Sequence, residues 1–243
     1  VFEDILPVNN AADLPQEQGL GGFQVVIEDA AGKKGAGAGQ VLYDVFGNPI
    51  GTTYVQVNGN FVYDIDGNPI VDVLGDGSVT TNANGVAVIK NLAPAKYGVI
   101  IDPPEGEGWI QTSTIEGTPL IDAWVKANEP PYFTEFGPVG HHASFGFVKE
   151  MNIIPAGGSA NITGKVVSTH YSRPPDYTFW PGAAFPDIYV GLNDMSVGRG
   201  KAIYITEGAP DSTFTIPNVP DGNYQLAIWD DNLDIVFASQ GIT

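Results

Sequence analysis

The chain has 243 residues, of which 28 are acidic, ten are basic and none is cysteine, so its formal net charge is −18. This charge repels phosphate backbones and anionic lipid, which makes nucleic acid and membrane surfaces poor partners and divalent cations attractive ones. The absence of cysteine excludes disulfides, thiolate zinc sites and cysteine nucleophiles. A hydrophobic content of 43% is sufficient for a packed core, and no apolar run is long enough to span a membrane.

Short segments with period-two alternation recur along the whole chain. Each is bounded by Gly, Pro, Asn or Asp, the residues that supply turn geometry, and no window of about 12 residues has a convincing helical face. Many short strands at regular spacing predict an all-β protein built from sandwiches or barrels. The expected strands include, in chain order, Phe23–Ile27, Thr53–Val57, Gly85–Ile89, Tyr97–Ile101, Asn161–Val167, Ile188–Leu192, Ser212–Ile216 and Tyr224–Trp229.

A short repeat lies in the first half of the chain. The segment Tyr-Asp-Val-Phe-Gly-Asn-Pro-Ile at 43–50 recurs as Tyr-Asp-Ile-Asp-Gly-Asn-Pro-Ile at 63–70. Its Asp-x-x-Gly-Asn pattern is typical of tight turns, because Asp caps its own backbone and Gly takes a positive φ. Two copies are too few for a solenoid, so the repeat predicts successive hairpin corners within an insertion.

A second repeat relates the two halves of the chain. The turn Asn91–Tyr97, which joins two expected strands, is matched by Asn218–Tyr224. This match predicts two homologous sandwich domains, 1–150 and 151–243, with a linker-like Pro-Ala-Gly-Gly-Ser segment at 155–159.

The turn motifs resemble those of prealbumin-like modules. The residues from Asn82 to Val99 and from Thr213 to Leu226 are similar to the pattern T-D-x-x-G-x-Y-x-F-x-N-L-x-P-G-x-Y-x-V. This pattern is found in the Cna-B, B-type serine–aspartate-repeat adhesin (SdrD B-like) and carboxypeptidase-regulatory-like families. The start of the chain, Phe2 to Val25, resembles the opening of the B-type adhesin modules.

The resemblance implies an all-β fold of two tandem prealbumin-like (transthyretin/Ig-like) Greek-key β-sandwiches with long loop insertions. The first would be an SdrD B-like or Cna-B-like domain over 1–150, with insertions at about 32–80 and 103–145. The second would be a carboxypeptidase-regulatory-like domain over 151–243.

The same resemblance implies a role without catalysis. Such modules are usually extracellular stalk or adhesive units, so we expect a structural or display module of a secreted bacterial cell-surface protein. Its expected partners are other protein modules or copies of itself, and a glycan is a further candidate. No Gly-x-Ser-x-Gly or His-Glu-x-x-His motif indicates an enzyme. Because the chain begins at Val1 rather than Met, we expect it to be a processed or excised piece of a longer protein.

Two alternatives to a stalk remain open. One is a subunit of a self-assembling extracellular filament, in which an edge strand or an aromatic loop docks onto the next copy. The other is an accessory or carbohydrate-binding domain of a larger secreted hydrolase.

Calcium is the one candidate cofactor. The first loop of the family holds Ca²⁺ with side-chain oxygens, and Asp4, Asp13 and Glu17 are the matching candidate ligands here. Their spacing is longer than that of the family, and Pro7 replaces part of the usual Asp/Asn-rich run, so a solvated acidic loop is the alternative. The Asp-x-Asp-x-Asn segment at 64–68 has the early spacing of a calcium loop, but a hairpin turn explains it without metal.

Aromatic residues gather near prolines in two long connections. Long connections in compact domains are often functional, and exposed rings stack on sugars or anchor a partner protein. The alternative is that the rings pack as lids over the sandwiches or fill the joint between domains. The candidate binding residues are Trp124, Tyr132, Phe133, Tyr177, Phe179 and Trp180.

Overall fold

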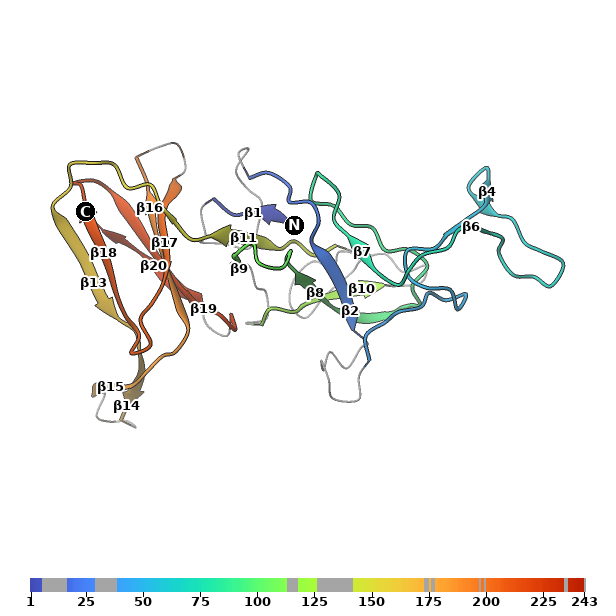
Figure 1. Cartoon of the computed structure of the whole chain (residues 1–243). Coiled ribbons are helices and arrows are strands. Elements are labelled where there is room, and N and C mark those ends of the chain that lie inside the picture. Colours follow the sequence, from blue (N-terminus) through green and yellow to red (C-terminus); the bar gives the residue numbers. More distant parts are fainter. Residues whose placement is uncertain are drawn as a thin grey trace. The chain divides into compact units, whose positions relative to one another are not determined.

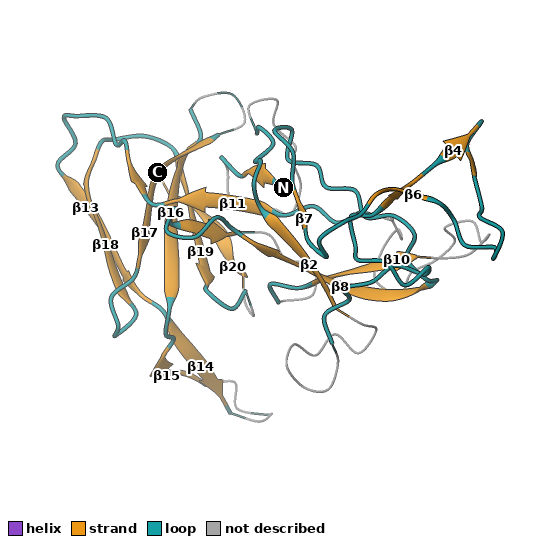
Figure 2. Ribbon diagram, turned by 45° about the vertical axis from the view of Figure 1, so that its right-hand side comes forward, coloured by secondary structure: helices purple, strands orange, loops and turns teal. Residues whose placement is uncertain are grey.

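The regular elements of the chain are β-strands, most of them paired antiparallel (Figures 1 and 2). No helix is present among the residues that the structure describes, and hence none there that is long and apolar enough to cross a membrane. The prediction of an all-β protein is confirmed, whereas the tandem Greek-key arrangement stays a prediction. The structure, a computed structural model, describes residues 1–5, 17–28, 39–112, 118–125, 142–172, 175, 178–196, 198, 200–233 and 236–242.

The chain divides into two compact units, and each draws on more than one segment. Unit 1 comprises Val1–Phe2, Gln18–Glu107 and Pro119–Phe145. Unit 2 comprises Glu3–Glu17, Gly108–Thr118 and Gly146–Thr243. The main segment of unit 2 therefore begins close to the predicted boundary, but the unit also takes in two short segments from the first half of the chain.

Unit 1 is built on a four-stranded sheet in the order β10-β8-β2-β7. The β8 strand lies between β2 and β10, with Gly98 opposite both Glu28 and Asp122. Because side chains alternate across a strand, Ile27 and Tyr97 share one face of this sheet, and both are buried. The strands are β2 (Gln24–Glu28), β7 (Val79–Thr80), β8 (Ala95–Asp102) and β10 (Ile121–Val125).

Residues 42–76, which we call the arm, include two small ribbons that extend from this sheet (Figures 1 and 2), while Ile50 at the base of the arm packs against Ile27 and Tyr97. The first ribbon pairs β3 (Thr53–Tyr54) with β6 (Val71–Val73). The second pairs β4 (Gln56–Val57) with β5 (Asn60–Phe61). The arm thus accounts for most of the insertion expected at 32–80.

The prediction of a strand at Gly85–Ile89 is wrong. The residues keep the side-chain alternation of a strand, with Val86 and Val88 exposed and Ala87 and Ile89 partly buried. A strand also requires a ladder partner, and the described part of the chain provides none for this segment. The side chain of Asn82 instead accepts a hydrogen bond from the backbone N–H of Val86 (3.1 Å), which holds the segment by a local turn.

Unit 2 is built on a five-stranded sheet in the order β12-β17-β16-β19-β20, next to the β13–β18 pair. Fully buried Val190 and Leu192 from β16 pack with Ile216 from β18 in its main hydrophobic core. In β19, the side chains that point away from this core include Trp229, which belongs to a second buried cluster. The strands are β12 (Met151–Asn152), β13 (Ala160–Lys165), β16 (Ile188–Asp194), β17 (Lys201–Glu207), β18 (Thr213–Val219), β19 (Tyr224–Asp230) and β20 (Val236–Ile242).

Two smaller sheets complete the described strands. One has the order β1-β11-β9, with β1 at Phe2–Glu3, β9 at Trp109–Gln111 and β11 at Gly146–Lys149. The other pairs β14 (Val167–Tyr171) with β15 (Phe179–Ala184).

Candidate functional site

The arm takes its local structure from the repeated turn. In both copies the aspartate that opens the turn, Asp44 or Asp64, accepts hydrogen bonds from the N–H groups two and four residues later, at 2.8–3.0 Å. The glycines at the third following position, Gly47 and Gly67, have φ values of +82° and +84°. The predicted hairpin-turn chemistry is confirmed, since the Asp64 side chain accepts the hydrogen bonds of its own turn.

An aromatic cluster links the two ribbons of the arm. The Tyr54 hydroxyl donates to Asp44 Oδ2 and accepts from Asn48 Nδ2 (2.9 Å). Its ring meets those of Phe46 and Phe61 edge to face, with centroid distances of 5.0 and 5.8 Å. Burial, with the Asp44 hydrogen bond, raises the pKa of the Tyr54 phenol, which therefore remains a hydrogen-bond donor. The arm is thus an ordered element with its own internal contacts.

The outer surface of the arm is unusually apolar. Of the 17 large apolar side chains exposed among the described residues, 11 lie on the arm. Ile65, in the second turn, is fully exposed, and Val73 in β6 is 60% exposed. Large exposed apolar patches often mark contact sites, whereas single exposed apolar side chains are common. The 11 residues are Leu42, Tyr43, Val45, Phe46, Val57, Tyr63, Ile65, Ile70, Val71, Val73 and Leu74.

The charges of the arm all have one sign. Its five ionisable side chains other than tyrosine are aspartates, and it contains no Lys, Arg or His. The backbone N–H and the hydroxyl of Ser78 both donate to Asp76 Oδ1 and hold the pKa of this carboxyl below its usual value. The arm therefore combines many exposed apolar side chains with charges of negative sign only. The aspartates are Asp44, Asp64, Asp66, Asp72 and Asp76.

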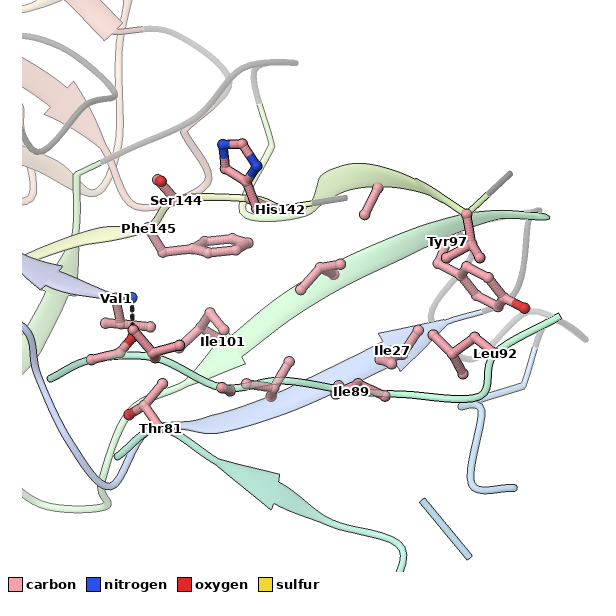
Figure 3. A pocket seen from close by; sticks show the side chains of 18 of the residues that line it. Val1, Ile27, Thr81, Ile89, Leu92, Tyr97, Ile101, His142, Ser144 and Phe145 are labelled. Atoms are coloured by element: carbon pink, nitrogen blue, oxygen red, sulfur yellow. Dashed lines mark hydrogen bonds between the residues drawn. The ribbon is translucent and has the colours of Figure 1, made fainter. Parts of the chain in front are cut away.

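Unit 1 also contains an apolar cavity of about 520 Å³ (Figure 3). Ile27 and Ile101 of the sheet and Ile89 and Leu92 of the neighbouring segment line the cavity together with Phe145. Polar residues also line the cavity: Tyr97, whose hydroxyl donates to the Ala93 carbonyl at 2.8 Å, His142 and Ser144. The lining is mainly apolar, so the cavity offers contact chiefly for apolar groups.

The candidate calcium ligands differ in how far they are buried and in whether the structure describes them. Asp4 is only 1% exposed, and its Oδ2 accepts a hydrogen bond from Thr112 Oγ1 at 2.6 Å. Glu17 is partly exposed, and Asp13 lies outside the described residues. Within the described ranges, no group of three or more His, Asp or Glu side chains is arranged to hold a metal ion. Calcium binding at Asp4, Asp13 and Glu17 stays a prediction.

The Asp4–Thr112 contact predicts a stability effect. Thr112→Val removes a hydroxyl donor from a buried carboxylate and keeps the shape of the side chain, so unit 2 should lose about 1–3 kcal/mol of unfolding free energy. Chemical denaturation measures this loss. Thr112→Ser, which retains the hydroxyl, is the matched control, and an equal loss in both variants would contradict the role assigned to the hydrogen bond.

Two of the aromatic candidates have described side chains. Trp124 of β10 is 39% exposed, and the Nζ of Lys96, which is paired with Asp122, lies 5.9 Å from its ring centroid. Trp180 of β15 is 47% exposed and stacks on His170, with ring centroids 6.2 Å apart. These tryptophans belong to different units. Tyr132, Phe133 and Tyr177, and the side chain of Phe179, lie outside the described part, so ligand binding by this set stays a prediction.

Sequence reasoning identified the arm as an insertion but missed its apolar surface. The available signal was the segment Ile70–Leu74, where apolar residues occupy both parities of a short strand. A strand with one buried face has apolar residues at only one parity, so this pattern is compatible with an element whose two faces both meet a partner.

Comparison of the chain with models of protein families, with curated proteins and with solved structures finds no match in any of the three. The resemblance to prealbumin-like modules therefore stays a prediction.

Proposed function

We propose that the chain is a non-catalytic structural and adhesive module of a secreted bacterial cell-surface protein. The observation that carries this proposal is the arm, an element ordered by its own hydrogen bonds and ring contacts that presents large apolar side chains to solvent. Apolar surfaces of this kind are typical of contact sites between proteins. The net charge of −18 favours solubility of a module that displays such a surface.

The use of the polar side chains is consistent with this role. Asp44 and Asp64 cap turns. The Thr81 hydroxyl accepts from the Phe23 N–H at 3.0 Å and donates to the Leu20 carbonyl at 2.7 Å. These groups hold the backbone of unit 1 in place, which is what a display module requires of its polar residues.

Surface labelling tests this proposal. Antibodies raised against the purified chain should label intact cells of the source organism, and protease treatment of those cells should remove the label. An antibody to a cytoplasmic protein, which should label permeabilised cells only, is the control. Labelling of the chain that requires permeabilisation would contradict the proposed location.

The filament subunit is a second candidate function. It is favoured by the presence, in the same unit, of an apolar arm and of an extended segment whose backbone has no ladder partner among the described residues.

A further inference from the structure

The segment 86–90 of unit 1 has the side-chain alternation of a strand, but none of the described strands pairs with it. Val88 is 63% exposed, while Ala87 and Ile89 line the cavity (Figure 3). Among the described residues, no hydrogen-bond partner is found for the backbone groups of residues 87–90. Extended backbone with open N–H and C=O groups is a template for the addition of another strand.

The β6 strand of the arm supplies a second open edge. Its neighbour in the described sheets is β3, and the two form a ribbon of two strands. The side chains of Val71, Val73 and Leu74 are all exposed. β-Branched residues at an edge favour strand pairing, and the exposed valines of this edge also offer apolar surface to a partner strand.

The charges of the two elements are complementary. The arm contains five aspartates and no basic residue, whereas residues 77–101 contain two lysines and no acidic residue. Lys96 is paired with Asp122, and Lys90, at the end of the open segment, is exposed. A chain with a net charge of −18 thus contains both an acidic apolar edge and a matching edge without negative charge.

From these features we infer that the β6 edge of the arm of one copy adds to segment 86–90 of a second copy. Main-chain hydrogen bonds between the two edges supply affinity, and the exposed valines of both edges pack together. The general repulsion between two acidic copies is screened beyond about 8 Å at physiological salt, so the local contact decides the outcome.

This contact joins the arm of one copy to segment 86–90 of the next. In a pair of copies, one therefore keeps a free segment and the other a free arm. Such heterologous contacts continue into a ring or an open filament. The inference rests on the proposed structural function and deepens it, because it names a second copy of the chain as the partner.

Sedimentation velocity on the purified chain tests the inference. The weight-average sedimentation coefficient should rise with protein concentration for the wild-type chain. Val73→Glu alters the arm, Val88→Glu alters the open segment, and each should weaken association by about tenfold or more. Both side chains are at least 60% exposed, so the melting temperatures should stay close to that of the wild type.

Mixing the two variants gives the sharper result. A Val88→Glu chain retains an intact arm and a Val73→Glu chain retains an intact segment, so an equal mixture should form a dimer that grows no further. Ile153→Glu, at a 53% exposed site in unit 2, is the matched control and should associate like the wild type.

Three outcomes would overturn the inference: a wild-type chain that is monomeric at every concentration, variants that associate like the wild type, or a mixture that stays monomeric. A wild-type chain that is monomeric at every concentration would indicate that the arm binds a different protein. None of them affects the surface-labelling test, so failure of this inference is distinguishable from failure of the proposed function.

Discussion

Replacing Ile216 by alanine should lower the free energy of unfolding of unit 2 by about 2–5 kcal/mol. Ile216 is completely buried in β18, where it packs with Val190 and Leu192 of β16 in the main core. The substitution removes apolar contact and leaves a cavity that rigid neighbouring strands cannot fill. Denaturant unfolding followed by tryptophan fluorescence, to which the buried Trp229 of the same unit contributes, measures the change.

Two further variants make the Ile216 result specific. Ile153→Ala removes the same atoms from an exposed side chain of unit 2 and should change stability by no more than about 0.5 kcal/mol. Ile216→Val removes one methylene and should cost about 0.5–1.5 kcal/mol. A loss at Ile216→Ala as small as that at Ile153→Ala would contradict the assignment of β18 to the core.

The strands of unit 2 could be predicted from the sequence because their pattern is local. The buried apolar residues Ile188, Val190 and Leu192 of β16, like Phe214 and Ile216 of β18, lie at every second position, as is typical of a strand that packs on a core. Local pattern was insufficient at Gly85–Ile89, which has the same alternation. Whether such a segment becomes a strand depends on a neighbour elsewhere in the chain, and short-range periodicity contains no information about that neighbour.

The candidate site was harder to predict for the same reason. Nothing in the sequence around Asp4 indicates that its carboxylate is buried and accepts a hydrogen bond from Thr112, 108 residues away in the sequence. The turns of the arm were predictable, since Asp44 and Asp64 act within five residues. The exposure of Ile65 and Val73 was not, because composition alone does not distinguish a buried valine from one held out in solvent.

Gly85→Ala should destabilise unit 1 by about 2–5 kcal/mol, for two separate reasons. Gly85 has a φ of +72°, a backbone conformation that costs an L-residue about 1–2 kcal/mol. A Cβ atom at this position would also overlap the carbonyl oxygen of Val1 and lie 2.7 Å from Gly19 Cα, both of which are backbone atoms. Backbone cannot move aside as a flexible side chain can, so the clash adds about 1–3 kcal/mol.

Gly59→Ala separates these two contributions. Gly59, in the arm, has a similar φ of +80°, but nothing lies within 4 Å of the position its Cβ would take. The Gly59→Ala substitution should therefore lower the free energy of unfolding only by the cost of the positive φ, about 1–2 kcal/mol. Scanning calorimetry of both variants measures the difference, which reports the close approach of the Val1, Gly19 and Gly85 backbones. Equal losses in the two variants would mean that the backbones of Val1, Gly19 and Gly85 do not approach one another as they do in the structure. The arrangement of the 81–92 segment in unit 1 would then be different.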